Sequence, residues 1–169
     1  MANTFELIAS STVGAGGATT IDFTSIPQTY TDLCLKLSAR VNQSSSYGID
    51  VYLLPNGSSS SLTAKRLYGD GSAAGSDSLT QIRGIATSTA QTANTFANTE
   101  FYIPNYTGST YKSVSVDGVA ENNATNAFEL LVAGLWSNTA AITSLTLSVP
   151  STFAFQQYST AYLYGVKNA

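Results

Sequence analysis

The feature that most constrains this chain is a strict alternation of apolar and polar residues along positions 30–41. Every second residue from Leu33 onward is apolar, and Asp32, Lys36 and Arg40 lie among the residues between them. Successive side chains of a β-strand point to opposite faces of its sheet, so this period of two predicts a strand with one face in a core. An amphipathic helix would need a period near 3.6, and we find no convincing stripe of that kind.

Similar short runs recur along the whole chain, and turn-forming residues separate them. Pro55, Asn56 and Gly57 end one run, because proline fixes φ and Asn-Gly tolerates positive φ. Positions 86–97 are rich in threonine and poor in apolar mass, so we expect a loop or an edge segment there. The other predicted strands cover residues 4–9, 19–23, 47–54, 61–67, 79–85, 99–103, 111–116, 128–135, 145–149 and 160–166. This pattern predicts an all-β fold, a two-sheet antiparallel β-sandwich, in a single domain over residues 1–169.

The composition removes several classes of function. With no histidine and one cysteine, the chain can form neither a Ser-His-Asp or Cys-His catalytic site nor a zinc site of the usual Cys/His type. Seven Lys+Arg against ten Asp+Glu give a net charge of −3, which argues against a surface that follows nucleic-acid phosphates. The apolar runs are too short to span a membrane, and we see no secretory signal. One cysteine allows no internal disulfide, which fits folding in a reducing cytoplasm.

Three sets of polar residues could carry chemistry, and each also has a simpler explanation. Asp70 and Asp77 could bind calcium, but their spacing does not match an EF-hand loop, and acidic-glycine loops are usually solvated turns. Glu100 and Glu129 could hydrolyse a glycoside only if the fold brought them within about 5–10 Å. Cys34 lies on the polar face of its strand, and no histidine is present to activate it, so a sheet-surface or subunit contact is favoured. We therefore expect no catalytic, cofactor-binding or metal-binding residue and no cofactor.

Tyrosine is the abundant aromatic residue, with ten in the chain beside seven Phe and one Trp. Its side chain covers a large area at low entropic cost, which suits protein interfaces and surfaces that stack on carbohydrate. We expect half or more of the rings to edge the core. Tyr102, Tyr106 and Tyr111, around Pro104, form the cluster that we expect to matter for binding, with Tyr106 as an exposed member.

Both ends of the chain carry a recognisable sequence. Residues 5–14 read Phe-Glu-Leu-Ile-Ala-Ser-Ser-Thr-Val-Gly, residues 21–33 read Ile-Asp-Phe-Thr-Ser-Ile-Pro-Gln-Thr-Tyr-Thr-Asp-Leu, and residues 161–168 read Ala-Tyr-Leu-Tyr-Gly-Val-Lys-Asn. These ends resemble a family of small virion proteins of tailed bacteriophages, common among cyanophages and other marine phages. The middle of the chain, residues 41–140, is generic. The resemblance implies a jelly-roll-like structural module on the particle, either on the capsid exterior or in the tail and its fibres.

The resemblance and the composition together predict a non-enzymatic virion structural protein. A surface rich in Ser, Thr and Asn but poor in charge makes salt-insensitive hydrogen bonds and tyrosine contacts, which suit permanent assembly. We expect a capsid decoration (cement) protein that is made in the host cytoplasm and binds the assembled major capsid protein as a homotrimer, without a nucleic-acid or membrane partner. The alternative is a tail or head-fibre module that binds host-surface carbohydrate. A carboxylate-pair glycan hydrolase is the remote alternative.

Overall fold

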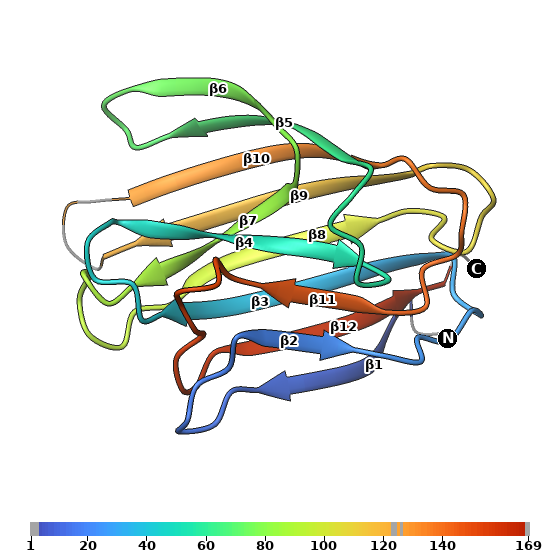
Figure 1. The fold of residues 1–169 in the computed structure, drawn as a ribbon, viewed down its shortest axis with the longest axis horizontal. Coiled ribbons are helices and arrows are strands. Elements are labelled where there is room, and N and C mark those ends of the chain that lie inside the picture. Colours follow the sequence, from blue (N-terminus) through green and yellow to red (C-terminus); the bar gives the residue numbers. More distant parts are fainter. Residues whose placement is uncertain (1–3, 123–124, 126, 168–169) are drawn as a thin grey trace.

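The computed structural model describes residues 4–122, 125 and 127–167. The secondary structure of this part of the chain consists of β-strands (Figure 1). No helix that could cross a membrane is present among the described residues. The strands are β1 (Phe5–Thr12), β2 (Thr20–Phe23), β3 (Asp32–Val41), β4 (Gly48–Pro55), β5 (Leu62–Gly69), β6 (Ala74–Leu79), β7 (Ile82–Ser88), β8 (Ala97–Ile103), β9 (Lys112–Glu121), β10 (Ala127–Trp136), β11 (Leu145–Ser148) and β12 (Thr160–Val166). The all-β prediction is confirmed.

Eight of these strands follow the order of a jelly roll. One run is β1-β12-β3-β8 and the other is β2-β11-β4-β7, and all neighbours within each run are antiparallel. When β5, β6, β9 and β10 are left out of the numbering, these orders become 1-8-3-6 and 2-7-4-5, the order of two Greek keys in a jelly roll. A short parallel pairing of Arg40 with Thr87 and of Val41 with Ser88 joins β3 to β7. The sandwich-like fold is therefore one continuous hydrogen-bonded sheet that doubles back on itself.

The remaining four strands, which we call the extension, continue one layer of the sandwich. They follow β8 in the order β9-β10-β5-β6, again antiparallel, and the β5–β6 hairpin lies at the top of Figure 1. β7 forms the edge of the shorter run and lies across β8, β9 and β10. The layers are close: a Cβ at Gly84 would lie 2.7 Å from the Phe101 ring, and one at Gly134 would lie 2.8 Å from Ile82. Beyond β7, no layer formed by the described residues covers the inner face of the extension.

The core lies between the two layers, and β3 contributes to it as its alternation predicts. Leu33, Leu35 and Leu37 are fully buried, and Phe101 pairs with Leu35 from β8. Arg40 lies at the end of β3 and is also buried; its guanidinium donates hydrogen bonds to the carbonyls of Gln91, Thr92 and Thr95. This contact fastens the loop that joins β7 to β8, in the segment predicted to be a loop or an edge.

The eleven strands predicted from the pattern are all present, with boundaries that differ by a few residues. The twelfth, β6, was missed, because its sequence Ala-Gly-Ser-Asp-Ser-Leu lacks β-branched and aromatic residues and follows a turn. Pairing with β5 makes it a strand: Arg66 stands opposite Asp77 and Tyr68 opposite Gly75. Tertiary pairing overrides the weak local preference here.

Candidate functional site

The outer face of the extension, the side turned away from β7, carries an unusual group of exposed apolar side chains. Leu67 on β5 and Leu131 on β10 are direct cross-strand partners and are 61% and 48% exposed. Val119 on β9, 38% exposed, is a diagonal neighbour of Leu131, whose direct partner on β9 is Asp117. We call Leu67, Val119 and Leu131 the apolar patch. Contiguous exposed apolar groups on an otherwise polar surface mark sites of interaction.

Two hollows flank the apolar patch on this face. The larger, about 830 Å³, is lined by Leu67 and Leu131 together with Tyr102, Ser115 and Ala133. The smaller, about 580 Å³, also takes in Leu67, Leu131 and Val119. Leu67 and Leu131 therefore stand where both hollows meet, in a position to enter a partner surface while the hollows receive its side chains.

On the opposite, inner side of the extension lies a cleft of about 930 Å³, between the start of β4 and the strands β5 and β10. It exists because β4 and β7 leave this end of the extension uncovered. Its walls include Tyr47, Asp50, Arg66, Asp70 and Phe128. Aromatic, basic and acidic side chains thus meet in one concave site, which is the usual composition of a ligand pocket.

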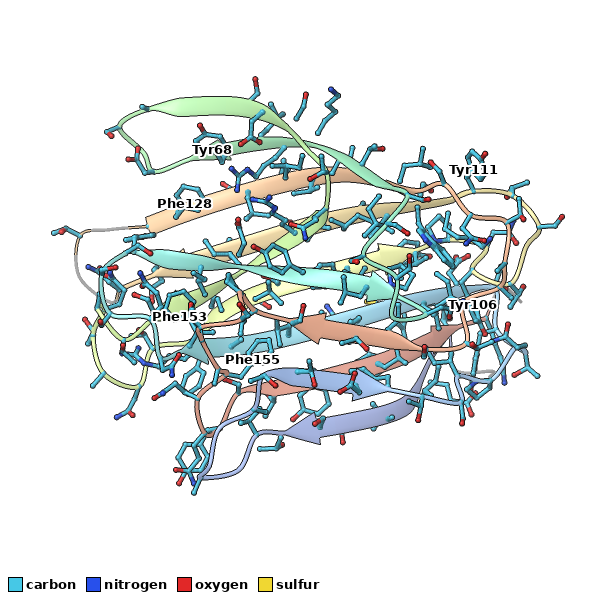
Figure 2. The ribbon with its side chains drawn as sticks, in the orientation of Figure 1. Tyr68, Tyr106, Tyr111, Phe128, Phe153 and Phe155 are labelled. Atoms are coloured by element: carbon cyan, nitrogen blue, oxygen red, sulfur yellow. The ribbon has the colours of Figure 1, made fainter. Side chains whose placement is uncertain are left out.

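Aromatic rings form one wall of the cleft. Phe128 lies 6.0 Å from Tyr47 and 5.9 Å from Tyr68, measured between ring centroids, and it is stacked on Tyr68 (Figure 2). Tyr68 lies against Gly75, where a Cβ would come within 2.6 Å of the ring, so a larger residue there would displace the ring. The Tyr47 hydroxyl donates a 2.9 Å hydrogen bond to the carbonyl of Ala120. These contacts hold the rings in place before any ligand binds.

A ladder of ion pairs borders the aromatic wall. Asp50 on β4 accepts from Arg83 at 2.6 Å and from Arg66 on β5 at 3.4 Å. Arg66 also donates to both carboxylate oxygens of Asp77 on β6, at 3.1 and 2.6 Å. The hydrogen bond to Asp77 raises the pKa of Arg66 and lowers that of Asp77. The ladder links β4 and β7 to the extension and fixes the polar groups of the cleft.

Asp70 and Asp77, the pair considered for calcium, serve separate purposes. Asp77 is the end of the ion-pair ladder, whereas Asp70 accepts hydrogen bonds from the Ser72 amide and hydroxyl and from the Ala73 amide at the β5–β6 turn. These bonds, with that of the Ala73 amide foremost, lower the pKa of Asp70 to about 2. Among the residues that the structure describes, no three His, Cys, Asp or Glu side chains are grouped as a metal site would require.

Glu100 and Glu129, the pair considered for glycoside hydrolysis, share the outer face but not a cleft. Glu100 on β8 stands opposite Asp117 of β9 and forms an exposed ion pair with Lys36. Glu129 on β10 stands opposite Val119, so strand β9 separates the two carboxylates. Neither hollow of this face includes both. The fold does not place them on opposing walls, as a bond-cleaving pair requires.

The tyrosine cluster predicted around Pro104 is divided by the fold. Tyr106 is fully buried and its hydroxyl donates to the Pro27 carbonyl, so the prediction that it is exposed is wrong. The chain turns back into the core after β8, where a tyrosine is stable once its hydroxyl has an acceptor. Tyr111 is exposed, and Tyr102 donates a 2.6 Å hydrogen bond to Asp32. Figure 2 shows Tyr106 and Tyr111 in separate positions at one end of the sandwich.

Cys34 lies on the outer-facing side of β3, as its alternation predicts, but it is buried. Its cross-strand partners are Tyr164 on β12 and Tyr102 on β8. Burial is the main cause that raises the pKa of its thiol to about 11. The neutral thiol form is therefore favoured, and the side chain is a packing group inside one chain rather than an exposed contact.

Sequence reasoning did not identify the residues that line the cleft. Asp50, Arg66 and Phe128 come from three separate strands, and the turn residue Asp70 was considered only as a calcium ligand. Their alternation shows that they lie on strands, but no spacing motif joins them. One signal was available in the sequence. Arg66 is a charged residue on the same strand face as Leu62 and Ala64, which are buried, so a charge occupies a position that faces inward.

Comparison of the chain with protein-family models, with curated proteins and with solved structures finds no match. The functional argument therefore rests on two surfaces on opposite sides of the extension. The apolar patch can bind a protein surface by burying Leu67, Val119 and Leu131. The cleft can bind a polar ligand through fixed hydrogen-bonding groups beside an aromatic wall.

Proposed function

We propose that this chain is a non-enzymatic structural protein of a bacteriophage particle, a capsid decoration protein that docks on the assembled major capsid protein through the outer face of its extension. The observation that carries the proposal is the apolar patch, in which Leu67 and Leu131 pair directly and are both largely exposed. The resemblance of both chain ends to small phage virion proteins supports the identity of the partner.

The low charge of the protein supports permanent assembly. Charged residues make up 10% of the chain, so contacts made by its surface are affected little by salt. An apolar centre with a polar rim is the usual arrangement of a protein interface. An interface that exists only on the assembled shell stabilises the shell by mass action.

A second group of exposed apolar side chains supports contact between copies of the chain, which the proposed homotrimer requires. The layer β1-β12-β3-β8-β9-β10-β5-β6 ends at the extension on one side and at β1 on the other. At the β1 side it exposes Phe5 and Leu7 on β1 and Tyr162 on β12. β1 is an edge strand, with a free row of backbone groups that a neighbouring copy can contact. Contact between copies at this edge leaves the apolar patch available for the shell.

The test is the amount and place of the protein on purified particles. A decoration role predicts a copy number comparable to that of the major capsid protein, with density on the capsid exterior in an image reconstruction. The variant Leu131→Lys should lose most of its occupancy, because a charge enters the interface. Its folding should be unaffected, because Asp117 stands directly opposite.

The matched control is Tyr111→Lys, which charges another exposed apolar side chain outside the patch and should keep normal occupancy. Normal occupancy of Leu131→Lys particles would contradict docking through the patch. Only a few copies per particle, located in the tail, would contradict decoration and favour the fibre alternative.

A further inference from the structure

We propose that the cleft on the inner side of the extension binds a neutral saccharide, with a sugar ring against Phe128 and sugar hydroxyls hydrogen-bonded to Asp50 and Arg66. The cleft does not include the patch residues Leu67, Val119 and Leu131, so the inference can be tested apart from shell docking, although the smaller outer hollow shares Phe128 and the β5–β6 turn with the cleft. The volume of about 930 Å³ lies in the range of small-molecule sites and accommodates a short oligosaccharide.

The aromatic wall provides the apolar contact. The C–H groups of a sugar ring are attracted to the electron-rich face of an aromatic ring. Phe128 has no polar group, is partly exposed, and contacts the rings of Tyr47 and Tyr68. Ile49 and Ile85 continue the apolar lining of the cleft. The wall is therefore preorganised, which lowers the entropic cost of binding.

The ion-pair ladder provides donors and acceptors with capacity to spare. Within the described residues, the Asp50 carboxylate accepts one bond from Arg66 and one from Arg83, whereas a carboxylate has about four acceptor positions. Arg66 uses three of its N–H groups, toward Asp50 and Asp77, and a guanidinium has about five. The side chain of Asp50 is 27% exposed to solvent and that of Arg66 is 16% exposed. A hydroxyl both donates and accepts, so sugar hydroxyls can use both sets.

The charge balance of the site selects a neutral ligand. Asp50, Asp70 and Asp77 give one more carboxylate than the guanidinium groups of Arg66 and Arg83. An anionic group would therefore be repelled, since each guanidinium already faces a carboxylate. A cation would have to compete with the two arginines for Asp50 and Asp77, and Asp70 is already engaged by its turn.

The experiment is a titration of the whole protein with defined probes, followed by NMR shifts of the backbone amides. The neutral probes are maltotriose, lactose and chitobiose. The probe 3′-sialyllactose tests an anionic sugar, and Nα-acetyl-lysine amide, whose side-chain amine is free, tests a cation. At least one neutral probe should shift residues 46–50, 66–72 and 127–128. Outer-face positions distant from the cleft, such as Ser115 and Asp117 on β9, should give no response.

Matched variants locate the contact. Phe128→Leu keeps apolar bulk but removes the ring, so it should weaken binding about fivefold or more. Tyr111→Leu removes an exposed ring outside the cleft, so it should bind within about twofold of the parent. Leu131→Lys should bind as the parent protein does, which separates this site from the docking patch.

Several outcomes would overturn the proposal. They are the absence of shifts with every neutral probe at concentrations well above the millimolar range, equal affinity of the Phe128→Leu variant while its spectrum remains folded, and tighter binding of the anionic or cationic probe. Because particle occupancy of Leu131→Lys is measured separately, failure here leaves the docking proposal standing, and the reverse holds as well.

Discussion

The jelly roll and the extension are built from the same kind of strand but are stabilised differently. In the jelly roll, β3 and β8 are buried on their inner face by the opposite layer, and Leu35 and Phe101 are fully buried. In the extension, β5 and β6 lie beyond β7, and Arg66 and Asp77 occupy inward positions that apolar residues would fill in a closed core. The covered part holds the fold by apolar burial, and the uncovered part has two free faces for binding.

The largest effect should come from opening the covered part. Phe101→Ala removes a buried ring from between the layers and should lower the free energy of unfolding by about 3–5 kcal/mol. Leu131→Ala, on the exposed face of the extension, should change it by less than about 0.5 kcal/mol. Urea denaturation measures both. Equal losses would contradict the exposed position of Leu131.

The second test breaks the ladder that joins the two regions. Asp50→Asn keeps the shape but removes the charge that faces Arg66 and Arg83. Because the three groups are partly buried, the loss should be about 1–2 kcal/mol, between the values for exposed and buried pairs. Hydrogen exchange should accelerate in β5 and β6 more than in β3 and β8.

The control for the ladder is Lys36→Met, which removes the ion pair of Lys36 with Glu100. Both of these side chains are largely exposed, so the free energy of unfolding should change by less than about 0.5 kcal/mol. Uniform acceleration of exchange in the Asp50→Asn variant, across β3 and β8 as well, would contradict a local role for the ladder.

The smallest effect should come from acid, and it should be confined to the β5–β6 turn. The pKa of Asp70 is lowered from 3.8 to about 2 by hydrogen bonds from Ala73 and Ser72. A lowered pKa means that this stabilisation is fully present above 3.8 and is lost as the pH falls through about 2. An NMR titration of the Asp70 carboxylate should have its midpoint near 2, with the Ser72 and Ala73 amides shifting in parallel. A midpoint near 3.8 would contradict the turn geometry.

The sequence predicts strands well where alternation and side-chain type agree. In β3, apolar residues from Leu33 to Val41 alternate with more polar ones, so the sequence shows directly which face of the strand enters the core. In β6 the residue types are those of a turn, and only pairing with β5 reveals the strand. Tyr106 shows the same limit for burial, because an aromatic residue near a turn can lie inside or outside, and here a backbone acceptor at Pro27 decides.

The sequence by itself determined that the chain is built from strands, which faces of them are apolar, and which chemistries its composition excludes. These properties depend on the type and spacing of neighbouring residues, because a strand has a fixed period of two. Only the tertiary structure decided that β9, β10, β5 and β6 extend one layer, and that Asp50, Arg66 and Phe128 meet in a cleft. Strand order and register depend on contacts between residues far apart in the chain, for which the local pattern of a single strand carries no signal.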